Sequence, residues 1–204
     1  MPPVSTPRLI LASTSPYRRE LLSRLRQPFD AVPPQVDESP LPGEQPRALA
    51  CRLALAKAHA VAARHPDAVV IGSDQVAELD GQGLGKPLVH SVAVQQLRRM
   101  RGQAVVFHSA IAVVRQAHGF EQDDLAQVTV RFRDLSDAEI EDYLRAEQPY
   151  DCAGSARSEG LGIVLLESID SDDPTALIGL PLIRTARLLR AAGLQFPGAG
   201  PIVR

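Results

Sequence analysis

Arg8-Leu-Ile-Leu-Ala-Ser-Thr-Ser-Pro-Tyr-Arg-Arg-Glu-Leu-Leu22 begins as an apolar run, continues through small polar residues and ends in a helical pattern. The run 9–12 predicts a buried strand. Ser15 predicts an N-cap, and Pro16 fits the first helical position because the backbone N–H that proline lacks would have no partner there. The stretch therefore predicts a strand, a tight turn and a helix whose free amides face the turn.

The predicted helix start has the properties of an anion site. Its backbone amides and the positive end of its dipole attract anions. Arg18 and Arg19 add two fixed charges whose guanidinium geometry suits phosphate oxygens. These features predict an anionic, phosphorylated ligand. Many capped helices bind nothing, however, and paired arginines on a first turn are often solvated, so the rest of the chain has to decide.

The chain has 204 residues, of which 45% are hydrophobic, so it can bury a substantial core as one domain or as two closely joined lobes. A net charge of −2 argues against broad nucleic-acid binding, which usually needs a basic face. Cys51 and Cys152 stand far apart and in no metal-ligand spacing, which predicts reduced thiols in the cytoplasm. The sequence shows no signal-peptide pattern and no apolar stretch near the ~20 residues of a membrane span. We expect a soluble cytoplasmic protein without a nucleic-acid or membrane partner.

Strand-like and helix-like runs alternate along the chain, which predicts a mixed α/β domain. Strands are expected over 68–77, 104–115, 127–132 and 161–166, and helices over 46–64, 91–101, 136–148 and 181–192. A polar loop containing Gly119 is expected to join the strands 104–115 and 127–132. We assign residues 1–204 to a single domain, with loose ends at 1–7 and 195–204.

A second cluster of polar residues occurs where the expected buried strand 68–77 turns polar partway along, in Ile71-Gly-Ser-Asp-Gln75. Burying a carboxylate such as that of Asp74 is costly unless the group is paired, hydrogen-bonded or bound to a metal. Asp74 is therefore expected to have a partner or to face a cleft. The alternative is an aspartate that bonds the amides of a nearby turn.

Glu38 and Lys57 are further candidates. Glu38 follows Asp37 in a proline-rich loop, where an acidic pair is usually solvated. Lys57 belongs to the predicted alanine-rich helix and has few charges around it in sequence. A phosphate ligand and a lysine that merely extends to solvent both fit that position.

Gly81-Gln-Gly-Leu-Gly-Lys-Pro87 invites comparison with a phosphate-binding P-loop. Asp80 stands where that motif needs its first glycine, and Pro87 replaces the Ser or Thr that binds Mg²⁺. The segment is therefore not a P-loop. It predicts a tight turn that delivers Lys86 towards the same anion, or else an ordinary hairpin connection.

Taken together, the segments between 9 and 189 resemble the Maf family of nucleoside triphosphate pyrophosphatases. The motifs that carry the resemblance are Leu-Ala-Ser-Thr-Ser-Pro-Tyr-Arg-Arg-Glu-Leu-Leu22, Val-Asp-Glu38, the helix with Lys57, Gly-Ser-Asp-Gln75, Gly-Lys-Pro87 and Cys152-Ala-Gly-Ser-Ala-Arg-Ser-Glu-Gly160. The resemblance implies an elongated α/β fold with a central mixed sheet, two lobes and a groove between them. It also implies a divalent metal, Mg²⁺ or Mn²⁺, a nucleoside triphosphate substrate and a homodimer. The residues it gathers around one cleft are Ser13, Arg18, Glu38, Lys57, Asp74 and Lys86.

Tyr17, Gln75 and Glu159 look like the YceF-type subgroup of that family, which acts on 7-methyl-GTP. The subgroup commonly has Trp where this chain has Tyr17. Methylation at the seven-position makes guanine cationic, so an aromatic ring gains cation–π attraction and a carboxylate can accept from the N–H edge of the base. Tyr17 and Glu159 fit those roles, whereas Gln75 offers both donors and acceptors. Alternatively, Tyr17 only packs on the first helix and Glu159 is solvated.

For hydrolysis between the α- and β-phosphates, we expect Asp74 to be the general base or a ligand of the metal-assisted water. Glu38 would help Asp74 to hold the metal, because hard divalent ions favour carboxylates and phosphate oxygens. Charge on the phosphates would be neutralised by Arg18, Lys57 and Lys86, with Arg19 at the helix start and Ser13 bonding a phosphate oxygen. Two other functions remain possible from the sequence: hydrolysis of a different nucleoside triphosphate, and nucleotide sensing without turnover in the control of cell division.

Overall fold

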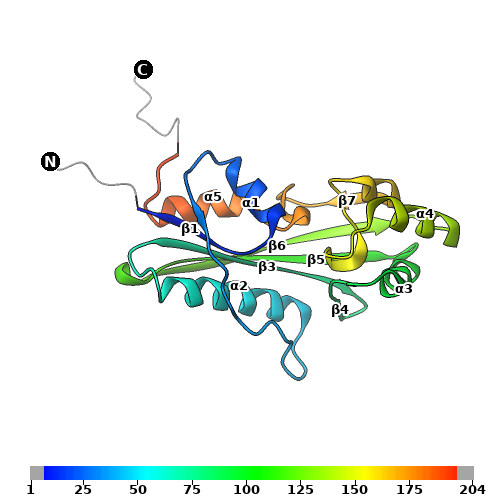
Figure 1. Ribbon diagram of the computed structural model, residues 1–204, viewed down its shortest axis with the longest axis horizontal. Coiled ribbons are helices and arrows are strands. Elements are labelled where there is room, and N and C mark those ends of the chain that lie inside the picture. Colours follow the sequence, from blue (N-terminus) through cyan, green and yellow to red (C-terminus); the bar gives the residue numbers. More distant parts are fainter. Residues whose placement is uncertain (1–6, 197–204) are drawn as a thin grey trace, which may run out of the picture.

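The computed structural model describes residues 7–196, which form an elongated α/β fold around one seven-stranded mixed sheet (Figure 1). The strand order is β2-β1-β3-β5-β6-β7, and β4 pairs with β3 off this path. The strands are β1 Leu9–Ala12, β2 Asp30–Ala31, β3 Val69–Leu79, β4 Gln82–Leu84, β5 Ala104–Arg115, β6 Phe120–Phe132 and β7 Leu166–Asp170. The helices are α1 Pro16–Ser23, α2 Pro46–Ala62, α3 His90–Met100, α4 Asp137–Glu147 and α5 Leu182–Ala191. The expected fold class is confirmed.

The opening stretch forms the predicted strand, turn and helix. β1 pairs in parallel with both β2 and β3 and is buried along its whole length. The Ser15 side chain caps α1 by accepting from the Arg18 N–H at 3.4 Å, and Pro16 occupies the first helical position. β1 therefore delivers the turn to the middle of the sheet, which places the start of α1 beside β3.

Three groups of buried side chains hold the layers together. Figure 1 shows α1 and α5 on one face of the sheet and α2 on the other. Leu9 and Leu11 pack with α1 and α5, whereas Ile10 and Ala12 pack with α2, so β1 is apolar on both faces. A third group joins α3 and α4 to the far ends of β3, β5 and β6. The long strands β3, β5 and β6 thus link the two ends of the molecule.

The middle of β3 has no strand partner on one of its edges. On that edge, β1 pairs with β3 only as far as Gly72, and β4 begins to pair at Ala77. Residues 73–76 pair with β5 on their other edge. The backbone of this segment, which carries Asp74 and Gln75, therefore lacks a strand partner on one side.

Two predicted elements are wrong. The run 161–166 is mostly a 3₁₀ helix, η3 Leu161–Leu165, and β7 begins at Leu166. Its Ile163 and Val164 are half exposed, so the apolar run does not reflect a buried strand. The polar loop expected before 127 is strand instead, because β6 begins at Phe120 and pairs with β5 along its length. The turn itself is the 3₁₀ helix η1 Gln116–His118 and Gly119, which has a left-handed φ of 60°.

The other predicted elements agree closely with the structure. The capping box at Ser136 opens α4, and the left-handed Gly193 follows the end of α5. Most of the expected loose ends, 1–6 and 197–204, lie outside the described residues. No helix within residues 7–196 has the length and apolar character needed to cross a membrane. Both Cys51 and Cys152 are free thiols.

Candidate active site

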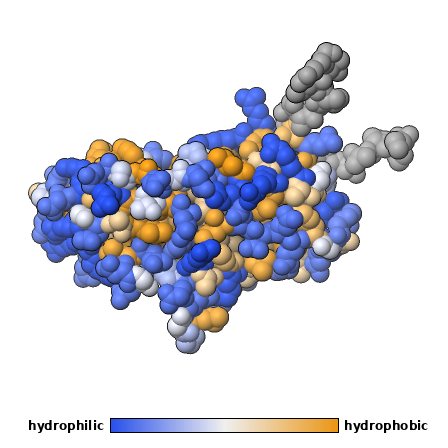
Figure 2. Space-filling model, turned by 180° about the vertical axis from the view of Figure 1, so that it is seen from behind, coloured by the Kyte–Doolittle hydropathy of each residue, from blue (hydrophilic) through white to orange (hydrophobic). Residues whose placement is uncertain are grey.

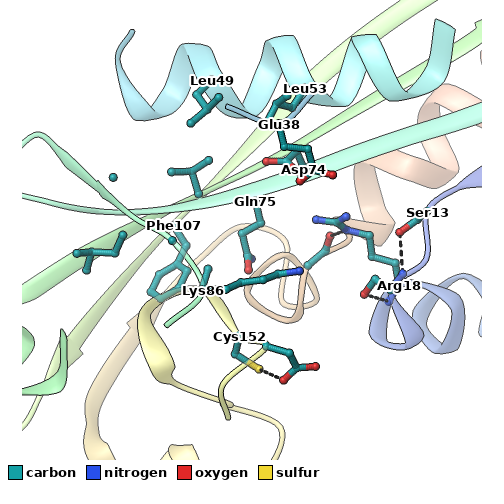
Figure 3. A pocket seen from close by; sticks show the side chains of 18 of the residues that line it. Ser13, Arg18, Glu38, Leu49, Leu53, Asp74, Gln75, Lys86, Phe107 and Cys152 are labelled. Atoms are coloured by element: carbon teal, nitrogen blue, oxygen red, sulfur yellow. Dashed lines mark hydrogen bonds between the residues drawn. The ribbon is translucent and has the colours of Figure 1, made fainter. Parts of the chain in front are cut away.

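A cavity of about 1030 Å³ opens beside the unpaired segment of β3 (Figure 3). The turn before α1, the loop before α2, the hairpin after β3 and the loop after α4 all contribute to its walls. The expected site residues that line it are Ser13, Tyr17, Arg18, Glu38, Lys57, Asp74, Gln75, Lys86 and Glu159. Segments far apart in the sequence therefore bring these nine side chains to one cavity.

Lys57 lies at the centre of a three-residue charge cluster. Its Nζ donates to Asp74 Oδ1 at 2.6 Å and lies 2.9 Å from Glu38 Oε1. The side chains of Lys57 and Asp74 are 5% and 9% exposed, whereas that of Glu38 is 58% exposed. Lys57 therefore does not extend to solvent, and Asp74 is a paired, buried carboxylate rather than one that bonds turn amides. Glu38 is paired but open to the cavity.

Arg18 and Ser13 form the wall contributed by the turn before α1. Arg18 Nε donates to the Gly179 carbonyl at 2.9 Å, which leaves its two terminal nitrogens for a ligand. Burial lowers the pKa of the Arg18 guanidinium, and the charges of Asp74 and Glu38 oppose that shift. The Ser13 hydroxyl, which is buried, accepts from the Ser15 N–H at 3.1 Å. This turn and its arginine match the predicted anion site.

Lys86 reaches the same cavity from the hairpin that follows β3. β4 pairs with the end of β3, and the chain then leads through Gly85 to Lys86. Figure 3 shows the Lys86 side chain pointing into the cavity towards the side that holds Arg18. The glycine-rich segment therefore positions a lysine, as predicted.

Arg19 does not line this cavity. It is exposed and borders a separate shallow hollow on the surface with Thr14 and Glu20. Successive residues on a helix point about 100° apart, and α1 is turned so that Tyr17 and Arg18 face the cavity while Arg19 points away from it. The expectation that Arg19 binds substrate is therefore not supported by its position.

Tyr17 lines the cavity beside Asp151 and Arg157, two residues that the sequence did not single out. Its hydroxyl donates to the Asp151 carboxylate, 3.3 Å from Oδ2, and the Arg157 guanidinium carbon lies 5.3 Å from its ring centroid. Burial raises the pKa of the Tyr17 hydroxyl, and Cys152 and Asp151 add to the effect. One face of the ring is thus covered by an arginine.

Glu159 lies beside that arginine. Its Oε1 is 3.5 Å from Arg157 Nε, and its side chain is 25% exposed. Arg157 also pairs with Glu147 at 3.0 Å. Glu159 is therefore neither fully solvated nor fully neutralised, and its carboxylate faces the cavity.

The Gln75 side chain is held by three acceptors. Its Nε2 donates to Ser109 Oγ at 2.8 Å, to the Ala176 carbonyl at 2.8 Å and to the Leu177 carbonyl at 3.0 Å. The two carbonyls belong to the 3₁₀ helix η4 Ala176–Ile178. These contacts resolve which end of the amide faces the cavity, a point that the sequence left open.

Sequence reasoning missed four residues at the site. Asp151 and Phe107 line the cavity, whereas Arg157 and Ser109 contact the lining residues Tyr17 and Gln75. Arg157 and Asp151 lie in or next to the motif 152–160, which was a usable signal. Phe107 and Ser109 lie on β5, two strands away from the opening turn, so only the folded sheet brings Phe107 to the cavity and the Ser109 hydroxyl to Gln75.

The residues present fit a divalent cation. Within residues 7–196, no three His, Cys, Asp or Glu side chains gather as a complete metal site. Asp74 and Glu38 nevertheless share one cation, the ammonium of Lys57. Mg²⁺ is commonly held by one or two carboxylates together with substrate phosphates and water, so a complete protein cage is not required.

The cavity offers two kinds of contact. Arg18, Lys57 and Lys86 supply positive charge, next to the paired carboxylates. Tyr17, Asp151 and Glu159 supply an aromatic ring and negative charge. A ligand with an anionic part and a flat, electron-poor or cationic part would match both.

Comparison with known families gives a match to the one described as Maf-like protein, over residues 8–192. The chain is 68% identical to the 7-methyl-GTP pyrophosphatase of Albidiferax ferrireducens, over 94% of this chain and 96% of that protein. It is 69% identical to the protein of the same name from a Polaromonas species, over 94% of this chain and 87% of that protein. A third such protein, from Burkholderia pseudomallei, is 61% identical over 96% of this chain and 92% of its own length.

Proposed function

The chain belongs to the family of Maf-like proteins, and on that premise we propose that it hydrolyses 7-methyl-GTP to 7-methyl-GMP and diphosphate. It is a hydrolase of acid anhydrides, a nucleoside triphosphate pyrophosphatase. The observation that carries this proposal is the convergence of three cationic side chains and two carboxylates on one cavity, in a chain 57% or more identical to proteins named for this reaction.

The reaction needs water to attack the α-phosphorus while the bond to the bridging oxygen breaks and diphosphate leaves. Asp74 is the group proposed to take the proton from that water, since it is buried and close to the cations that would hold the phosphates. Lys57 orients Asp74 through the 2.6 Å contact. Arg18 and Lys86 are proposed to neutralise charge on the leaving diphosphate, and Ser13 to bond a phosphate oxygen.

A divalent cation is part of the proposal. Asp74 and Glu38 would hold Mg²⁺ or Mn²⁺ together with phosphate oxygens. The cation supplies positive charge that lowers the repulsion between the triphosphate and these carboxylates. Removing it with a chelator is therefore expected to weaken triphosphate binding as well as turnover.

The aromatic and acidic side chains of the cavity are proposed to hold the base. One face of the Tyr17 ring is covered by Arg157, so the opposite face is the one left for stacking. Glu159 would accept from the N–H edge of the base, and Gln75 would contact it through its free amide oxygen. The methylated guanine is cationic, which favours both the ring and the carboxylate.

Two wider features are also proposed. A homodimer follows from the family resemblance, and Ile163 and Val164 are among the large apolar side chains left exposed for contacts. Figure 2 shows hydrophobic residues interspersed with hydrophilic ones over one whole face, including the end that carries α3 and α4. A cytoplasmic location is proposed from the nucleotide substrate. Sedimentation and cell fractionation test these two features.

The proposed activity is tested by diphosphate release with Mg²⁺ or Mn²⁺ from 7-methyl-GTP, GTP, dTTP, UTP, CTP and ITP. The expected result is the highest kcat/KM for 7-methyl-GTP, with turnover lost in an Asp74→Ala variant. A higher kcat/KM for another triphosphate would retain the chemistry and contradict the proposed base recognition. Binding without hydrolysis of any triphosphate would contradict the enzymatic function and favour a sensor.

A further inference from the structure

We propose that Ser109 is a positioning residue that, together with two backbone carbonyls, fixes the direction of the Gln75 amide. Gln75 then presents only its acceptor oxygen, Oε1, to the cavity and selects a base with hydrogen-bond donors on its edge. This inference rests on the proposed function, because it concerns how the same cavity reads the base of its nucleotide. It assigns a role to a buried hydroxyl that the hydrolysis itself does not use.

The contacts of the Ser109 hydroxyl determine its donor and acceptor roles. Ser109 Oγ donates its one proton to the Ala176 carbonyl at 2.7 Å, because a carbonyl can only accept. Its lone pairs are then what it offers to Gln75 Nε2, 2.8 Å away. Ser109 is 0% exposed, so water does not compete for either bond.

The η4 carbonyls exclude the opposite orientation of the amide. Ala176 O and Leu177 O lie 2.8 and 3.0 Å from the Gln75 nitrogen. A flipped amide would bring its oxygen against both carbonyl oxygens, where three acceptors meet without a donor, and leaving buried polar groups unsatisfied in this way is costly. Oε1 therefore points away from these acceptors, and Gln75 lines the cavity (Figure 3).

Three separate elements meet in this arrangement. Gln75 comes from the unpaired segment of β3, Ser109 from the neighbouring β5, and the carbonyls from η4. Gln75 and Ser109 are register partners in the sheet, so the ladder of the two strands holds their backbones in place. The fold therefore sets the direction of the Gln75 amide before any nucleotide binds.

An acceptor at this position distinguishes between purine bases. The pairing edge of guanine carries the donors N1–H and N2–H₂, and methylation at the seven-position strengthens them by adding positive charge. The corresponding N1 of adenine is an acceptor, which would face Oε1 without a proton between them. Sites built to bond a donor reject ligands that lack it, because buried polar groups are then left unpaired.

The test compares three variants with the wild type: Ser109→Ala, Ser109→Thr and Ser73→Ala. Ser73 is a matched control, because it is also 0% exposed and its hydroxyl bonds backbone carbonyls, those of Ala110 and Gly179, but it is not among the hydrogen-bond partners of the Gln75 side chain. Ser109→Thr keeps the hydroxyl and suits a strand. The readouts are the kcat/KM ratio for 7-methyl-GTP over ATP and the ratio of dissociation constants for 7-methyl-GMP and AMP by calorimetry.

In Ser109→Ala the η4 carbonyls still oppose a full flip, but the Gln75 nitrogen loses one of its three acceptors and Oε1 is no longer held at a fixed position, so both ratios are expected to fall tenfold or more, mainly through KM. Ser109→Thr should restore the ratios, and Ser73→Ala should leave them unchanged even if it lowers activity on both nucleotides. Equal ratios in Ser109→Ala and the wild type would overturn the positioning role. Because calorimetry needs no turnover, this result stays distinct from a failure of the proposed hydrolysis.

Discussion

At the scale of single residues, the buried ammonium of Lys57 holds the two carboxylates of the site together. It lies between Asp74 and Glu38, and a buried charge of this kind needs such partners because losing water is costly. Asp74 cannot be replaced without leaving Lys57 partly uncompensated. The pair therefore links the chemistry of the site to its stability.

Asp74→Asn tests the catalytic role with little change of shape. We expect kcat to fall by about 10²–10⁴-fold, the usual range for a lost general base, with a smaller change in KM. Steady-state diphosphate release from 7-methyl-GTP measures both. Asp37→Asn is the matched control, because Asp37 is exposed, lies outside the cavity and only accepts from the Ser39 N–H. A near-normal kcat for Asp74→Asn would contradict the role.

Cys152 is predicted to react slowly despite lying at the cavity wall. Burial, with help from the Asp151 charge, raises the pKa of its thiol to about 12. Compared with an ordinary thiol of pKa about 8.5, its thiolate fraction at pH 8 is lower by about a thousandfold. Rates of iodoacetamide labelling, measured by mass spectrometry on native and on unfolded protein, check this. Labelling of Cys152 at the same rate in both states would show the prediction to be wrong.

At the scale of elements, α2 lies unusually close to β3. A Cβ on Gly72 would stand 2.1 Å from the Ala54 carbonyl oxygen and 2.5 Å from the Ala58 nitrogen, both of them backbone atoms. Only glycine allows this approach. The approach in turn sets the distance between Lys57 on α2 and Asp74 on β3.

Gly72→Ala is expected to destabilise the fold by about 3 kcal/mol, since helix and strand must move apart to admit the methyl group. Urea unfolding measures the change as a lower midpoint. Gly85→Ala is the control, because a Cβ there has no atom within 4 Å. Equal midpoints for the two variants would mean that α2 adjusts without strain.

Arg52 of α2 fastens the loop that carries Glu38. Its Nε and Nη2 reach the two Glu44 carboxylate oxygens at 2.6 and 2.8 Å, and Nη2 also donates to the Ser39 carbonyl at 3.0 Å. Ser39 follows Glu38 directly in the chain. α2 thus carries Lys57 and, through Arg52, also holds the loop that carries Glu38, the exposed partner of Lys57.

This contact has a defined dependence on pH. Arg52 lowers the pKa of Glu44 to about 2. The stabilisation is therefore fully present above the ordinary glutamate pKa of about 4.3 and is lost as the pH falls from there through 2. In Arg52→Ala, the Glu44 pKa measured by carboxyl NMR should return towards about 4.3. Arg64→Ala, which removes an arginine bonded to the Pro33 and Ala60 carbonyls, should leave it low.

At the scale of the whole molecule, three long strands run through both ends of the fold. β3, β5 and β6 contribute to the core beside α1 and α5 and to the core beside α3 and α4. The cavity lies where β3 passes from one to the other. The two lobes therefore share one sheet rather than meeting at an interface.

We expect the protein to unfold in a single transition, because neither lobe can lose its strands without disrupting the other. Calorimetry should give equal calorimetric and van't Hoff enthalpies. A nucleotide that cannot be hydrolysed, at saturating concentration with Mg²⁺, should raise the midpoint temperature of that single transition without splitting it, since it binds only the folded state. Two separate transitions would contradict the single-domain assignment.

Sequence patterns predicted the structure correctly where the hydrogen bonds of a segment are made by its own neighbouring residues. The cap at Ser15, the proline at Pro16 and the capping box at Ser136 all appear as predicted, because each depends on neighbouring residues. The polar start of β6 was missed because its hydrogen bonds come from β5, across the sheet. The run 161–166 was misassigned because its apolar side chains stay partly exposed.

The sequence by itself determined the strand, turn and helix of residues 8–22, the place of Asp74 partway along a buried strand and the class of chemistry. Tertiary structure alone decided that Arg18 faces the cavity while Arg19 does not, since that depends on how α1 is rotated against the sheet. It also decided the direction of the Gln75 amide, because the carbonyls that set it lie about a hundred residues away in the chain. The residue types in the sequence indicate the chemistry of the site, whereas the direction of each side chain depends on atoms that only folding brings near.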